Sequence, residues 1–264
     1  MMLTRTRISR TTRTAAVFLT VLIAAAILAP LFVPYAVDAL DLANRRAAPS
    51  LAHWFGTDEL GRDVLTRVLF GARVSLAVGL LSAFVSVALG VAIGATAGYA
   101  GRWVDDLLMR LTDAMLAVPR LPLLMIAAAI LQPSVPLLVL LVGAAGWMET
   151  ARVVRAEVQS IAARDYITSA RAIGAGPARI VWRHVLPGVM PVASVAATLA
   201  VGRGILIESA LSFFGVGVQP PTASWGNMLY QAQTTMTSEP WLALFPGLFI
   251  FLTVLACNAV GTRT

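Results

Sequence analysis

The chain has 264 residues, of which 58% are hydrophobic and only 12% are charged, and its mean hydropathy is +0.81. A soluble domain carries about a quarter charged residues, so this composition excludes an ordinary water-soluble fold and predicts a protein built from membrane spans. The basic residues are all arginine. This excludes a phosphate-binding Walker loop, because that loop needs a lysine.

The sequence offers little for catalysis or metal binding. Its two histidines, His53 and His184, lie far apart, and neither has a Cys or carboxylate cluster nearby with metal-ligand spacing. They are also misplaced as bases for a nucleophile. The lone Cys257 cannot form an internal disulfide. We therefore expect no catalytic residues, no metal site and no cofactor in this chain, which disfavours an intramembrane enzyme.

Long uncharged blocks predict six transmembrane helices, because about 20 apolar residues span a bilayer core of roughly 30 Å. The expected spans are residues 15–33, 74–101, 104–131, 135–148 or slightly beyond, 186–207 and 241–260. The basic segment before the first span also fits a cleaved signal peptide. Its apolar stretch exceeds the roughly 7 to 15 residues that are usual there, which favours a retained anchor.

The arginines predict the orientation of these spans. With the N-terminus inside, the inner segments hold twelve arginines, including Arg5, Arg7, Arg10, Arg13 and Arg263, and the outer segments hold five. Cytoplasmic loops are enriched in positive charge, so both termini are expected inside. The net charge of +7 is then a topology signal, and nucleic-acid binding is not expected.

Several residues within the predicted spans suggest specific contacts. Gly90, Gly94 and Gly98 recur at four-residue spacing, which favours close helix packing; the alternative is that the lipid-embedded helix merely tolerates them. Asp113 and Arg120 lie seven residues apart on one face of the third span. Because charge in lipid is costly, this face is expected to meet protein or water, unless Arg120 snorkels to the membrane interface.

Two outer segments carry motifs. In residues 38–73, Thr57 or Asp58 can cap a short amphipathic helix that Gly71 ends. The motif residues of this segment are Gly56, Thr57, Asp58, Gly61, Arg62 and Asp63. Residues 208–240 are rich in Gly, Pro and Trp and are expected to form a folded loop, because irregular backbone cannot face lipid. This loop could line a translocation mouth or dock a partner.

The translocation path or outer gate is expected to combine this loop with charged residues of the spans. The candidates are Asp113, Arg203, Glu208, Phe213, Phe214, Gln219 and Trp225. Arg203 and Glu208 are five residues apart and do not share a helix face. Arg203 is therefore interpreted as a structural or pore-lining charge, and Glu208 as an interface residue.

Residues 149–185 form the long inner connector. A short helix is expected over 166–173, ended by Gly174, and Pro177 suits the first turn of a second helix that ends near His184. Small residues leave one side of the first helix open to another protein. A solvated loop held to anionic lipid by its arginines is the alternative.

The connector resembles the coupling-helix motif of bacterial ATP-binding-cassette (ABC) importer permeases, in which E-A-A precedes a Gly and a distal L-P. The residues that match this motif and would contact the ATPase are Asp165, Tyr166, Thr168, Ser169, Ala170, Arg171, Ala172, Ile173, Gly174 and Ala175. The motif's Glu falls on Thr168, and Asp165 lies three residues upstream. The two outer motifs narrow the resemblance to the second permease subunit of dipeptide, oligopeptide and nickel importers.

This resemblance implies an all-α membrane protein with the six-helix type I ABC importer permease fold, N-in and C-in, in the bacterial inner membrane. Residues 1–73 would form an inner arm, the first span and an outer capped helix, and residues 74–264 a five-helix core with coupling helices at about 155–185. The implied partners are a homologous second permease, one or two ATPase subunits that carry ATP and magnesium, and a periplasmic or lipid-anchored substrate-binding protein.

The substrate stays open among dipeptides, longer peptides, nickel chelates and haem, because these importers differ chiefly in the binding protein. A self-sufficient ion-driven transporter, with Asp113, Arg203 and Glu208 as relay groups, is the second hypothesis. It is disfavoured because the chain shows no recognisable inverted repeat and few intramembrane carboxylates.

Overall fold

The computed structural model describes residues 10–132 and 134–262, and nearly all of the regular structure in these ranges is helical. The elements are α1 (Arg10–Phe32), η1 (Leu42–Asn44), α2 (Val64–Tyr99), α3 (Arg102–Ala117), α4 (Arg120–Leu131), α5 (Val135–Ala144), α6 (Trp147–Ala162), α7 (Asp165–Ala172), α8 (Pro177–Ile180), η2 (Val181–Val185), α9 (Leu186–Phe213), α10 (Trp225–Ala232) and α11 (Trp241–Gly261). Arg5, Arg7 and Arg263, which contribute to the predicted orientation, lie outside the described residues.

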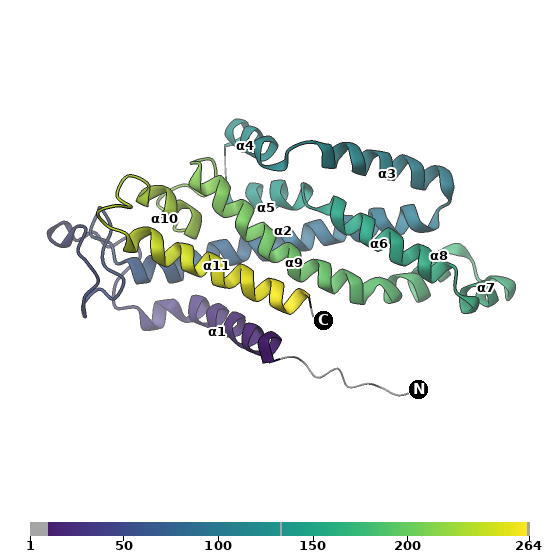
Figure 1. Cartoon of the computed structure of the whole chain (residues 1–264), viewed down its shortest axis with the longest axis horizontal. Coiled ribbons are helices and arrows are strands. Elements are labelled where there is room, and N and C mark those ends of the chain that lie inside the picture. Colours follow the sequence, from purple (N-terminus) through teal and green to yellow (C-terminus); the bar gives the residue numbers. More distant parts are fainter. Residues whose placement is uncertain (1–9, 133, 263–264) are drawn as a thin grey trace.

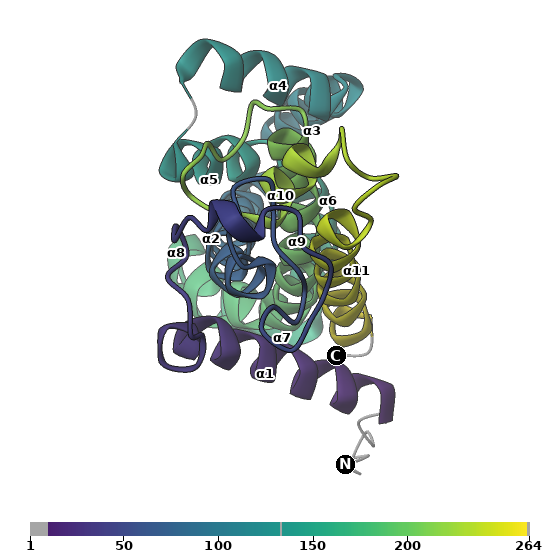
Figure 2. The same cartoon turned by 90° about the vertical axis from the view of Figure 1, so that its left-hand side faces the viewer.

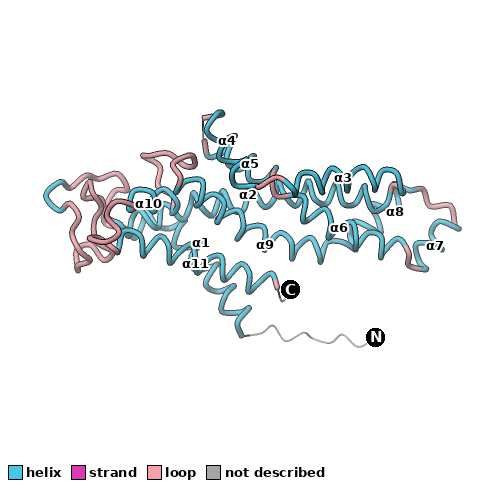
Figure 3. The backbone as a smooth tube through the Cα atoms, turned by 45° about the horizontal axis from the view of Figure 1, so that its top comes forward, coloured by secondary structure: helices cyan, strands magenta, loops and turns pink. Residues whose placement is uncertain are grey.

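The helices form an elongated bundle around α2 (Figure 1). This helix packs against α5, α6 and α9, and α9 packs in turn against α11. The long loops and α10 gather at one end of the bundle, and α7 forms the opposite end (Figures 1 and 3). Viewed along the long axis, α1 and α4 lie on opposite sides (Figure 2). The predicted outer and inner motifs therefore lie at opposite ends of the molecule.

Four helical runs are long and apolar enough to cross a membrane on their own: α1, α2, Pro177–Phe213 and α11. Two further pairs, α3 with α4 and α5 with α6, pass the same test together but are bent. The described residues therefore hold six spans when each bent pair counts as one, as the sequence predicts.

The long α2 corrects the predicted boundary between the outer helix and the second span. The sequence predicts a break at Gly71, yet one helix of 36 residues runs from Val64 to Tyr99. Gly71 serves packing instead, because a Cβ there would lie 3.3 Å from the backbone of Ser224. At 1.5 Å per residue α2 is about 54 Å long, so one end extends beyond a bilayer core of roughly 30 Å.

The predicted third span is not one straight helix. It breaks between α3 and α4 with a bend of 81°, because Pro119 lacks an N–H and the preceding Val118 is extended, with φ −81° and ψ 127°. Asp113 and Arg120 thus lie on two differently directed helices, and the prediction that they share one helix face is wrong.

The predicted inner connector is largely helical. After a bend of 42° at residues 145–146, α6 continues the fourth span to Ala162, so residues 149–162 belong to the bundle rather than to a loop. The second connector helix does not end near His184 either. It begins at Pro177 and continues through a π-helical turn into α9. Only residues 173–176 therefore separate the short α7 from the helical run Pro177–Phe213 that contains α9.

A proline-induced gap in α1 is closed by α2. Pro30 has no N–H to donate to the carbonyl of Ala26, four residues earlier. Arg73 of α2 supplies donors instead: its Nε lies 2.5 Å from the Ala26 oxygen and its Nη2 2.7 Å from the Ile27 oxygen. Because an unsatisfied carbonyl in lipid is costly, these bonds tie α1 to α2.

The three glycines at four-residue spacing lie where α2 packs against α6. A Cβ on Gly90 would meet Thr150 at 2.5 Å, and a Cβ on Gly98 would meet Val158 at 2.8 Å. At Gly94 the closest atom is the backbone oxygen of Ala151, at 2.5 Å. At each of the three positions a Cβ would lie within 3.0 Å of an atom of α6, so the structure leaves no room there for a larger residue.

Gly94→Ala tests this close packing. The added Cβ meets a backbone oxygen that cannot rotate aside, so α2 and α6 must separate. We expect a loss of about 1–3 kcal/mol of stability, measured as a lower thermal unfolding temperature of the purified protein in detergent.

Gly247→Ala in α11 is the matched control, because the nearest atom to a Cβ there is 4.0 Å away. Equal unfolding temperatures for the two variants would contradict the packing role of Gly94.

Candidate functional site

The inner end of the bundle carries a protruding elbow formed by α7 and residues 173–176. One apolar side chain anchors it: Ile167 is fully buried and packs in a cluster with Ile161, Ile180 and Val185. Ile173 at the tip is 88% exposed. The elbow is therefore anchored to the bundle through the buried side of α7, and its tip presents an apolar side chain to the outside.

The turn of the elbow requires a glycine. Gly174 has φ +91°, a left-handed conformation that other residues rarely adopt. No atom lies within 4 Å of a Cβ built on Gly174 or Gly176. The glycine is thus required by the backbone angle, and the space around the turn is open to a partner.

The predicted ATPase-contacting residues all lie on this elbow. Asp165 opens α7, where a carboxylate favours the positive end of the helix dipole, and Arg171 lies in its last turn. The Arg171 guanidinium lies 5.7 Å from the centre of the Tyr99 ring, and the Tyr166 and His184 rings are 6.0 Å apart. Thr168, Ser169 and Ala172 are exposed, whereas Ala170 and Ala175 are half-buried. The elbow thus presents small side chains to the outside.

The outer motif is a buried ion-pair cluster that holds the chain to the start of α2. Asp58 accepts hydrogen bonds from the Arg62 Nε at 2.7 Å and from the backbone N–H groups of Leu60 and Arg62. The Nε of Arg67 lies 3.6 Å from the same carboxylate. Both arginines also lie 3.4 Å from the side-chain oxygen of Gln231 in α10.

The rest of the motif fixes the turn before α2. Asp63 caps this helix by accepting bonds from the Thr66 N–H and hydroxyl, each at 2.8 Å, and it also contacts His53 at 3.0 Å. Gly56 and Gly61 have φ +75° and +76°, and a Cβ on either would overlap backbone atoms. The structure thus assigns the motif to the folding of the outer loop.

Thr57 completes this turn. Its hydroxyl accepts a bond from the Ala47 N–H at 2.8 Å and donates to the Asn44 carbonyl at 2.5 Å. The predicted capping role therefore belongs to Asp63, because Thr57 and Asp58 use their side chains within the loop and the helix starts only at Val64.

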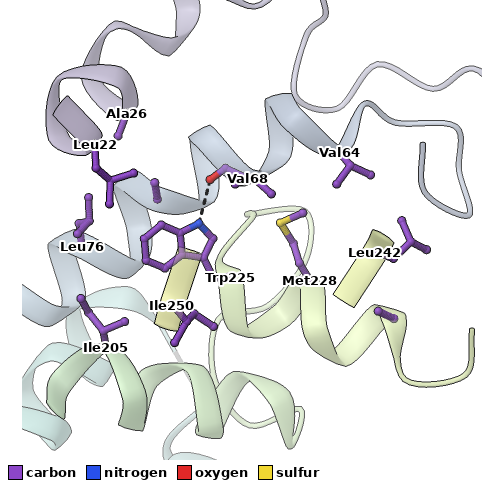
Figure 4. Packing of buried hydrophobic residues seen from close by; sticks show 12 residues of the cluster. Leu22, Ala26, Val64, Val68, Leu76, Ile205, Trp225, Met228, Leu242 and Ile250 are labelled. Atoms are coloured by element: carbon purple, nitrogen blue, oxygen red, sulfur yellow. Dashed lines mark hydrogen bonds between the residues drawn. The ribbon is translucent and has the colours of Figure 1, made fainter. Parts of the chain in front are cut away.

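Two of the predicted outer-gate residues are fully buried. Trp225 lies among apolar side chains of α1, α2, α9 and α11, and its indole N–H donates to the Val68 carbonyl at 3.0 Å (Figure 4). Glu208 is 0% exposed. Its carboxylate accepts hydroxyl bonds from Ser75 at 3.0 Å and Ser212 at 2.8 Å. Both therefore belong to the core, and the interface and path roles predicted for them do not fit this structure.

The other gate candidates are more exposed. Phe213 is half-buried, Phe214 is 53% exposed, and Gln219 is exposed and donates to the carbonyl of Gly215 at 2.9 Å. Asp113 pairs with Arg152 near the inner half of the bundle. These residues are not brought together into one site.

Arg203 is part of a charge cluster within the spans. Glu149, near the start of α6, pairs with both Arg120 of α4, at 3.2 Å, and Arg203 of α9. Towards the inner end, α6 continues this row of ion pairs to α3, through Arg152 with Asp113 and Arg155 with Asp105. The face of α6 that meets α3 thus carries two arginines, and each of them is paired with an aspartate of α3.

Residues 90–263 match the family described as binding-protein-dependent transport system inner membrane component. The chain belongs to this family. It is 40% identical over 247 residues to a peptide permease protein of Brucella suis biovar 1, which covers 93% of this chain and 82% of that protein. It is 41% identical over 249 residues to the glutathione transport system permease protein GsiD of Escherichia coli O6:K15:H31, covering 94% of this chain and 82% of GsiD.

The chain is therefore a multi-pass permease of the inner membrane with the type I ABC importer fold, and it works with partner subunits in an ABC transporter. The predicted fold class, family and location are confirmed. The elbow and the membrane charge cluster lie within the matched residues, whereas the outer motif precedes residue 90.

The ion pairs that Glu149, Arg152 and Arg155 of α6 form are not among the predicted site contacts. Glu149 is followed by two arginines, Arg152 and Arg155, at three-residue spacing. This helical pattern could have been matched to Arg120 and to the carboxylates Asp113 and Asp105. This match was not made because residues 149–185 were expected to form a connector outside the spans. Within the described residues no group of three His, Cys, Asp or Glu side chains could hold a metal ion.

Asp58→Ala tests the outer motif of the permease. It removes the carboxylate that pairs with both Arg62 and Arg67, which are 6% and 1% exposed. Removing one partner of a buried pair costs about 3–5 kcal/mol. We expect a strongly reduced yield of folded permease and a lower unfolding temperature.

Glu59→Ala is the control, since this neighbouring acidic residue is exposed. The assigned role of Asp58 is wrong if both variants unfold at the wild-type temperature.

Proposed function

We propose that this permease moves dipeptides or oligopeptides from periplasm to cytoplasm and is driven through the α7 elbow by separate ATPase subunits. The observation that carries the proposal is the elbow itself. It protrudes from the inner end, is fixed by Ile167 from below and exposes Ile173 at its tip. A rigid, exposed turn of this kind suits insertion into a cleft of a partner.

The elbow has a direct mechanical connection to the spans. Pro177 to Phe213 is helical without interruption, so a displacement of the elbow moves α9 as a packed body. This helix carries Arg203 in its middle and Glu208 nearer its outer end. Closure of the ATPase subunits would therefore shift residues at the membrane centre and beneath the outer loops.

The ATP and magnesium of the machine would be held by the ATPase subunits. With no lysine, this chain has no Walker loop of its own. The other partners we propose are a homologous second permease, a periplasmic or lipid-anchored binding protein at the outer loops, and the surrounding lipid. The single chain exposes many large apolar side chains on α3 and α4, among them Trp103 at 80% and Ile130 at 73%, which suit lipid or a second permease.

The peptide substrate is supported by the relatives, which are named as peptide and glutathione permeases. An importer of nickel or haem built on the same machine is the alternative. Purifying the permease with its partner subunits and identifying the captured solute by mass spectrometry tests the substrate. A metal chelate or haem in place of a peptide would overturn this part of the proposal.

The ion-driven alternative has less support in this arrangement. A relay needs its titratable groups within reach of one another. Asp113, Arg203 and Glu208 instead have separate partners: Arg152, Glu149 and a group of serines. Transport in liposomes that contain the permease alone would favour this alternative.

Gly174→Asp tests the coupling role. The substitution places a charged side chain at the φ of +91° and in the open space where the ATPase would dock. We expect loss of peptide-stimulated ATP hydrolysis in the assembled transporter, while the chain stays in the membrane at its normal level.

Gly247→Ala again serves as the control, because it lies in α11, away from the elbow. Undiminished hydrolysis and transport in Gly174→Asp would refute the coupling role.

A further inference from the structure

A small polar pocket lies within the membrane spans, where α2, α5 and α9 meet the start of α4. Its lining includes two arginines, two serines and two glycines: Arg120, Arg203, Ser82, Ser86, Gly146 and Gly204. We propose that this pocket is a transient binding site for a carboxylate of the transported solute. The inference rests on the proposed function and names the C-terminal carboxylate of a peptide as the group that enters.

The charges around the pocket favour an anion. Two guanidiniums line the pocket, and one carboxylate, Glu149, pairs with both. Within the described residues neither Arg120 nor Arg203 has another ion-pair or hydrogen-bond partner. One positive charge is therefore left uncompensated, and each guanidinium keeps free N–H donors. A carboxylate from the solute supplies the missing negative charge.

A buried hydroxyl without a hydrogen-bond partner also lines the pocket. Ser86 is 4% exposed and its Oγ has no hydrogen-bond partner. A buried polar group without a partner is costly, and this one lies in the wall of the same pocket as the guanidiniums. The hydroxyl is a donor that a bound carboxylate oxygen would satisfy.

The N-terminus of α6 also lies at the pocket. Gly146 is the N-cap of α6, a helix of 16 residues, and no side chain caps it. The first N–H groups of a helix favour an anion. Glycine is also required for space, because a Cβ on Gly146 would lie 2.7 Å from the Ser86 Oγ and one on Gly204 would lie 2.6 Å from the Ser82 Oγ.

The charge cluster beside the pocket is partly exposed in the single chain. The side chains of Arg203 and Glu149 are 37% and 42% exposed in the single chain, although they lie among membrane spans. Charges at this depth must face protein or water, because lipid would penalise them. The exposed side of the cluster therefore faces the interior of the assembled transporter.

The test compares a dipeptide with its C-terminal amide in proteoliposomes that hold the complete transporter. Alanyl-alanine and alanyl-alanine amide are each supplied at a concentration that saturates the binding protein. For Arg203→Gln we expect transport of the free acid to fall about tenfold or more, the effect of one lost charge-assisted hydrogen bond, and transport of the amide to change much less.

The matched control is Arg152→Gln, which removes an arginine of the next ion pair towards the inner end. Equal losses for acid and amide in Arg203→Gln would overturn the carboxylate site and leave the peptide function intact. Failure of the wild-type transporter to move either peptide, although both saturate its binding protein, would instead overturn dipeptide transport as the proposed function.

A second measurement needs neither a peptide nor the binding protein. In a Cys257→Ser background, Ser86→Cys in the complete transporter is treated with an anionic and a cationic methanethiosulfonate through the ATP cycle. We expect a preference for the anionic reagent, relative to free cysteine, that Arg203→Gln and Arg120→Gln abolish. No reaction in any state, or no change of preference in these variants, would contradict the proposal.

Discussion

Charged side chains that are buried or lie among membrane spans need partners inside the protein, and the resulting ion pairs hold the elements of the permease together. Asp58 pairs with two buried arginines at the outer end. Glu149 pairs with two arginines at the centre, and Asp105 binds Arg155 and Gln159 near the inner end. Because each carboxylate joins separate elements, these pairs fix the start of α2 and join α3, α4 and α9 to α6.

The features that the sequence predicted are those that depend on short segments. Apolar length gave the number of spans, and Gly174 marked the turn of the elbow because its conformation is a local property. The partners of the charged residues could not be predicted in this way. Glu149 and Arg203 are 54 residues apart, and the burial of Glu208 depends on Ser75, 133 residues away. Such pairs are set by tertiary packing.

The errors in the predicted elements have a similar cause. Pro119 was a readable signal for the break in the third span, but a proline predicts only that a helix breaks and does not predict the bend of 81° between the two parts. Gly71 and Gly174 are the same residue type, yet only Gly174 ends a helical segment. Gly71 lies inside a continuous helix, and its missing side chain leaves room for the backbone at the start of α10. The low helix propensity of glycine does not by itself distinguish a glycine that ends a helix from one that makes room for close packing.

The excess charge at the centre of the bundle has a physical consequence for transport. A site that carries a solute must bind it weakly enough to release it. Glu149 already pairs with both guanidiniums. A carboxylate of the proposed solute would therefore interact only with the positive charge and the N–H donors that Glu149 leaves free. Because Arg203 lies on α9 and Glu149 on α6, a movement of α9 would change how the Glu149 carboxylate is shared. If the proposed ATPase coupling acts through the elbow, the same displacement would alter the affinity of the proposed pocket and would link ATPase closure to release of the solute.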